Sequence, residues 1–120
     1  MELHYLDFEF SDEDSGHGSF DAMASVLPDR VPPLLEEIAA VLGWAHAAFG
    51  PPASLEDGGE WDFDLQAVAE PGRPLAARYD AASREVELGS WGAAARVTLT
   101  LTLGGTPAFC SACREAFILG

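Results

Sequence analysis

The chain has 120 residues, 48% of them hydrophobic, so it can bury one core and we expect a single domain over residues 1–120. Its formal net charge is -14, from 20 acidic residues against six arginines and no lysine. The missing lysine excludes P-loop, Schiff-base and kinase chemistry, and the negative charge argues against binding to nucleic acid or an anionic membrane.

The beginning of the chain carries no targeting signal that we recognise. Met1–His4 has neither the positive nor the apolar region of a secretory signal. The two cysteines form no disulfide framework, which is typical of a reducing compartment, so we expect a cytoplasmic protein. The arginine-only basic set, with abundant Ala, Gly and Pro, is typical of a GC-rich bacterial genome.

Two strands and a helix are predicted in the first half. Residues 3–10 alternate between apolar and polar side chains, residues 11–18 are polar and glycine-rich, and residues 19–26 alternate again. We therefore expect a hairpin with a long acidic loop, in which Phe10 faces Ser19. The Val31-Pro32-Pro33 sequence then begins a helix that runs to about Ala48.

The second half is predicted to be mostly strands. Alternating patterns cover residues 61–69, 75–79, 84–88 and 95–103, separated by turn residues such as Pro71-Gly72. Thr106 can cap a final helix that Pro107 opens. The predicted order is ββαββββα, an α+β two-layer sandwich in which two helices cover one face of a mainly antiparallel sheet of about six strands.

Cys110 and Cys113 form a CxxC motif at the beginning of the predicted last helix. The helix dipole there would lower a thiol pKa and favour a reactive thiolate, so a small thiol-dependent enzyme is our alternative hypothesis. Against it, Cys113 shares the apolar stripe of this helix with Phe109 and Phe117, as a small core residue would. No second cysteine pair completes a zinc site.

The acidic loop is a second alternative, because Asp12, Glu13, Asp14, His17 and Asp21 gather oxygen ligands of the kind that hard cations prefer. The spacing does not fit an EF-hand, since no glutamate falls at the twelfth loop position. A solvated loop explains the pattern equally well, and we assign no metal and no cofactor.

Charge is distributed unevenly, and this asymmetry carries our functional hypothesis. Sixteen of the 20 acidic residues precede Pro71, where they are balanced by one arginine. We expect a binding protein without catalytic activity that engages a basic protein partner through this region. Each candidate residue carries a carboxylate; the nine are Asp12, Glu13, Asp14, Asp21, Glu56, Asp57, Glu60, Asp62 and Asp64. A homodimer through sheet edges, or a charge that only maintains solubility, remains open.

Overall fold

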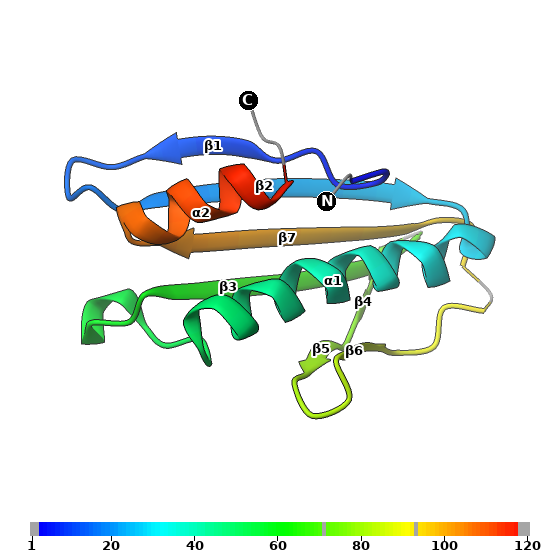
Figure 1. Ribbon diagram of the computed structural model, residues 1–120. Helices are drawn as coiled ribbons and strands as arrows, with labels where there is room; N and C mark the ends of the chain where they lie inside the picture. Colours follow the sequence, from blue (N-terminus) through cyan, green and yellow to red (C-terminus); the bar gives the residue numbers. More distant parts are fainter. Residues whose placement is uncertain (1–2, 71, 93, 118–120) are drawn as a thin grey trace.

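The computed structural model describes residues 3–70, 72–92 and 94–117. Within these residues the chain is an α+β fold of two helices and seven strands (Figure 1). The strands form a five-stranded antiparallel sheet, in the order β1-β2-β7-β3-β4, and a separate two-stranded sheet. The elements are β1 (Glu9–Asp12), β2 (Gly18–Val26), α1 (Val31–Phe49), β3 (Trp61–Ala69), β4 (Arg73–Leu75), β5 (Ala77–Asp80), β6 (Glu85–Leu88), β7 (Val97–Gly105) and α2 (Pro107–Phe117), with short 3-10 turns η1 (Pro28–Arg30) and η2 (Leu55–Asp57).

The three long strands β2, β7 and β3 form the centre of the sheet. Strand β7 pairs along its whole length with both neighbours, so that Phe20, Leu103 and Phe63 lie in one row across the sheet. Every second residue of β7 is buried because its side chain points to the helices, while the threonines between them are only half-buried. The strands predicted at residues 19–26, 61–69 and 95–103 are therefore confirmed, with ends shifted by at most two residues.

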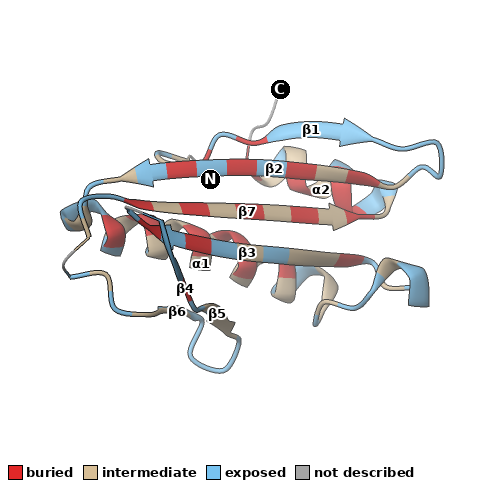
Figure 2. Cartoon of the chain, turned by 180° about the vertical axis from the view of Figure 1, so that it is seen from behind, coloured by how far each residue is buried: buried red, intermediate tan, exposed pale blue. Residues whose placement is uncertain are grey.

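Both helices lie on the same side of the five-stranded sheet (Figures 1 and 2). Helix α1 buries an apolar stripe at helical spacing, formed by Val31, Leu34, Ile38, Val41, Leu42 and Ala45. Aromatic rings join the layers, because the fully buried Phe109 of α2 stacks on Trp61 of β3 with centroids 5.7 Å apart. Trp44 of α1 contacts Phe109 and Phe117 of α2.

The start of α2 is capped as the sequence predicts. The Phe109 amide donates to Thr106 Oγ1 at 3.3 Å, and the Thr106 hydroxyl donates to Glu60 Oε2 at 2.7 Å. Gly105, the last residue of β7, has no room for a side chain, since a Cβ there would lie 2.3 Å from the Phe109 ring. This close approach sets the tight connection from strand to helix.

The first predicted strand is wrong over most of its length. Pairing covers only Glu9–Asp12, because the backbone amides of His4, Tyr5 and Leu6 donate to the carboxylate of Glu37 on α1 instead. The hairpin register also differs by one residue from our expectation, since Phe10 pairs with Phe20 and not with Ser19. A one-residue shift moves every side chain to the opposite face, so Phe10 now shares a face with Phe20, where the two rings touch.

The segment predicted as one strand at residues 75–79 is divided between the two sheets. Strand β4 pairs with the end of β3, after which the chain leaves the main sheet and forms the β5–β6 hairpin. The amide of Gly89 donates to the carbonyl of Ala76 at the point of departure. Of the Pro71-Gly72 turn predicted before β4, Pro71 lies outside the described residues.

One edge of the sheet is incompletely covered. Strand β4 pairs only with Ala67–Ala69, so the first six residues of β3 have no strand partner on that side. The Phe63 amide donates to the carboxylate of the preceding residue, Asp62, at 2.9 Å.

Candidate binding surface

The strand register gathers two acidic loops at one end of the sheet. Gly18 lies beside Gly105, which lies beside Trp61, so the β1–β2 turn and the loop that precedes β3 meet at the same end (Figure 1). Helix α2 also begins there, because Thr106 binds Glu60 through both its amide and its hydroxyl. We call this the acidic end, and its carboxylates are Asp12, Glu13, Asp14, Glu56, Asp57 and Glu60.

Asp21 of β2 and Asp62 and Asp64 of β3 lie on the sheet face that the helices leave uncovered, because they alternate along their strands with side chains directed at the helices. Asp21 of β2, Thr102 of β7 and Asp64 of β3 form one row across this face, and Asp62 lies one row closer to the acidic end. The Thr102 hydroxyl donates to Asp21 Oδ1 at 2.8 Å. Gln66 Nε2 donates to Asp64 Oδ2 at 2.9 Å. Both donors are neutral, so neither hydrogen bond brings a counterion to its carboxylate.

Leu55 connects the acidic end with this open sheet face. Gly104 lies in the same row as Asp62, and the space that a Cβ would occupy at Gly104 is 3.5 Å from the Leu55 side chain. The η2 turn therefore folds over the rim of the sheet, with Glu56 and Asp57 exposed beside it. The acidic end thus adjoins the rows of the open sheet face that carry Asp62, Asp64 and Asp21.

A groove of about 400 Å³ extends this region toward β1. Asp7, Glu9 and Asp21 line it together with Met23, whose side chain is 67% exposed. Sequence reasoning missed Asp7, Glu9 and Met23 as site residues. Their signal is the correct hairpin register, because pairing Glu9 with Asp21 brings two carboxylates opposite each other on one face.

The arginines do not neutralise this region. Among the described residues the only ion pair joins Arg78 to Glu87, on the β5–β6 hairpin. Arg73 and Arg96 lie at the opposite end of the sheet, where they donate to Ser90 O and Ser25 Oγ, each at 3.0 Å. The guanidinium of Arg114 lies 3.8 Å from the centre of the Phe10 ring.

The two cysteines are free, buried thiols of α2. Burial raises the pKa of Cys110, although its contact with the Gly18 backbone and the charge of Arg114 act in the opposite direction. Burial and the neighbouring Cys110 raise the pKa of Cys113 to about 12. The expected lowering by the helix dipole is therefore outweighed by desolvation, and both thiols are protonated at neutral pH.

The remaining chemical candidates are dispersed. Over residues 3–70, 72–92 and 94–117, no three His, Cys, Asp or Glu side chains are grouped so that they could hold a metal ion. His46 packs against the rings of Trp61 and Tyr79, and burial lowers its pKa. In the same described part of the chain, neither helix combines the length and apolarity that a membrane span requires.

Comparison of the chain with protein-family models, with curated proteins and with solved structures gives no significant match.

Proposed function

We propose that the protein is a cytoplasmic binding protein without catalytic activity, whose acidic end and open sheet face engage a basic protein partner. In this proposal the two helices and the sheet act as a two-layer sandwich that supports the surface from behind. One observation supports it: the strand register brings two acidic loops to the same end of the sheet as Asp62 and Asp64, and among the described residues no guanidinium forms an ion pair with a carboxylate of this region.

Such a surface favours a cationic protein in two ways. Its field accelerates the encounter, since complementary potentials raise association rates well above those of neutral surfaces. The groove between β1 and β2 then offers three carboxylates and the exposed Met23 side chain, which suits an arginine or lysine whose apolar stem lies on the methionine. A flexible thioether adapts to such a stem at little cost.

The test compares two triple variants that remove the same charge from different places. One changes Glu13→Gln, Glu56→Gln and Asp57→Asn at the acidic end. The other changes Asp29→Asn, Glu70→Gln and Glu115→Gln, which are also exposed but lie outside this surface. Each protein is immobilised and exposed to lysate at low salt, and the affinity of the retained basic protein is then measured by calorimetry at two ionic strengths.

We expect the acidic-end variant to bind about tenfold more weakly and the matched variant to bind within about threefold of wild type. The association rate of the wild type should fall steeply as salt is added. Equal losses in both variants would reduce the effect to net charge, and retention of no basic protein by the wild type would refute the proposal.

A further inference from the structure

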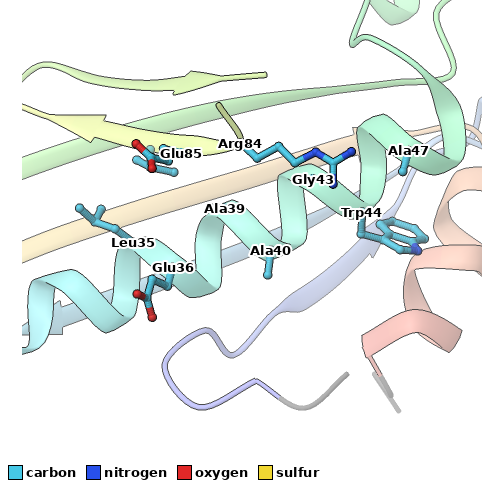
Figure 3. A pocket seen from close by; sticks show the side chains of 10 residues that line it. Leu35, Glu36, Ala39, Ala40, Gly43, Trp44, Ala47, Arg84 and Glu85 are labelled. Atoms are coloured by element: carbon cyan, nitrogen blue, oxygen red, sulfur yellow. The ribbon is translucent and has the colours of Figure 1, made fainter. Parts of the chain in front are cut away.

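A second surface lies on the opposite, helical side of the molecule. The outer side of α1 and the beginning of β6 enclose an open groove of about 620 Å³ (Figure 3). Its floor consists of small residues, namely Ala39, Ala40, Gly43 and Ala47, and Trp44 stands at one side. Helix axes are usually roughly 8–10 Å apart where two helices pack. Because alanine and glycine side chains are small, a second helix can pack on this face of α1 near the lower limit of that range.

The two ends of this groove carry opposite charges. Glu36 and, from β6, Glu85 lie toward the first half of α1, whereas the side chain of Arg84 reaches from the β5–β6 turn over the second half, close to Gly43 (Figure 3). In the described part of the chain, neither the Glu36 nor the Arg84 side chain has an ion pair or a hydrogen bond. Arg84 is also the only described non-glycine residue with a positive φ, 57°, a backbone conformation that residues with a side chain rarely adopt.

We propose that this groove is the interface of a homodimer, in which α1 of one copy packs antiparallel on α1 of a second copy. A two-fold axis between Ala40 and Gly43 would place Glu36 of each copy opposite Arg84 of the other, so these two side chains would form complementary pairs across the axis. Each pair would form twice, over an apolar centre.

The antiparallel arrangement also answers the objection that a chain of net charge -14 repels its own copies. The C-terminal end of α1 lies at the acidic end of the molecule, because Trp61 Nε1 donates to the carbonyl of Gly50 at 2.9 Å. Two antiparallel copies of α1 therefore hold their acidic ends at opposite ends of the dimer. At physiological ionic strength, charges further apart than about 8 Å are largely screened. This proposal stands independently of the proposed basic partner.

Charge exchange tests the interface in the full-length chain. Glu36→Arg places two arginines face to face in the dimer, and Arg84→Glu places two glutamates face to face. The double variant restores both pairs in reversed order. Sedimentation equilibrium gives the dimer dissociation constant, and circular dichroism checks that each variant is folded. Glu70→Arg and Arg30→Glu are the controls, since both make the same charge changes at exposed positions outside the groove.

We expect the wild type to dimerise, each single exchange in the groove to weaken dimerisation at least about tenfold, and the double variant to return to within about threefold of wild type. Glu36→Arg is the decisive variant, because it lowers the net negative charge and would strengthen the dimer if only overall repulsion mattered. A wild type that is monomeric at all concentrations would overturn the proposal. A dimer that is insensitive to both exchanges would also overturn the proposal, since it would use a sheet edge instead. A monomer whose groove binds a fatty acid through Arg84 would overturn it as well.

Discussion

The carboxylate of Glu37 accepts hydrogen bonds from the backbone amides of His4, Tyr5 and Leu6. It therefore takes the place of the strand partner that this segment would otherwise need. Replacing Glu37 by alanine keeps a good helix former in α1 but leaves these amides without their acceptor. We expect a loss of about 1–3 kcal/mol in the free energy of unfolding, measured by urea denaturation, with faster hydrogen exchange of the three amides.

Glu115→Ala is the matched control, because Glu115 is an exposed glutamate of helix α2, lies outside the proposed dimer groove and receives none of these bonds. It should stay within about 0.5 kcal/mol of wild type. If both alanine variants unfold at the same urea concentration, the Glu37 carboxylate does not anchor the N-terminal segment.

The thiol of Cys113 predicts a stability that depends on pH in the alkaline range. Its pKa is raised to about 12 in the folded chain, against about 8.5 for an unfolded cysteine. Below the unfolded pKa both states are protonated and the stability is fully present. As pH rises from about 8.5 toward 12, the unfolded chain loses this proton while the folded chain keeps it, so stability falls.

Thermal unfolding of wild type and Cys113→Ala between about pH 7 and pH 10 measures this effect. The midpoint of the wild type should fall more steeply above about pH 8.5, and alkylation of Cys113 in the folded state should stay slow throughout. Equal slopes in the two proteins, or rapid alkylation near neutral pH, would contradict a buried thiol and would revive the reactive-cysteine hypothesis.

At the scale of elements, the contact between the first hairpin and α2 depends on Gly18. A Cβ at this position would lie 2.6 Å from the Phe10 ring and 3.0 Å from the sulfur of Cys110. Gly18→Ala must therefore displace the Phe10 ring from its contacts with Phe20 and Arg114. We expect it to destabilise the protein by about 1–3 kcal/mol in chemical denaturation.

Gly92→Ala serves as the control, since nothing lies within 4 Å of the Cβ position and the residue is exposed. Its free energy of unfolding should change by less than about 0.5 kcal/mol. A Gly18→Ala protein with the free energy of unfolding of the wild type would show that the hairpin accommodates the added methyl group without loss of stability.

Periodicity predicts the long elements well, because their faces are decided by burial. Helix α1 and strand β3 begin and end within about one residue of the expected positions, and helix α2 starts at Pro107 as expected. The N-terminal segment has the same alternation as a strand, yet a side chain from α1 binds its backbone, and no local pattern signals such a distant acceptor. The hairpin register can be predicted from the sequence, because apolar Phe10 must share a face with Phe20.

For the whole molecule, the concentration of carboxylates at one end predicts a dependence on salt. Raising the sodium chloride concentration from about 0.01 M to about 0.15 M shortens the screening length from about 30 Å to about 8 Å. Repulsion within the acidic end should weaken, and the melting temperature of the wild type should rise. Differential scanning calorimetry at the two concentrations measures the increase.

The two triple variants separate local crowding of charge from net charge. The acidic-end variant should show a smaller increase in melting temperature than the matched variant with Asp29, Glu70 and Glu115 neutralised. Identical increases would mean that repulsion is spread over the surface. The sequence predicts the charge asymmetry, but the convergence of two loops 40 residues apart follows from the pairing of β2 and β3 with β7, which requires the sheet order.

The uncovered edge of β3 has a consequence for how crowded copies of this chain behave. An open strand edge is a template on which other chains can add and grow into aggregates. Here the Phe63 amide is already occupied by Asp62, and Asp64 follows two residues later. An incoming strand would have to displace a charged group and lie beside another, and the Ala53 amide already donates to the Trp61 carbonyl, so the edge discourages fibril growth although no strand of the described residues pairs there.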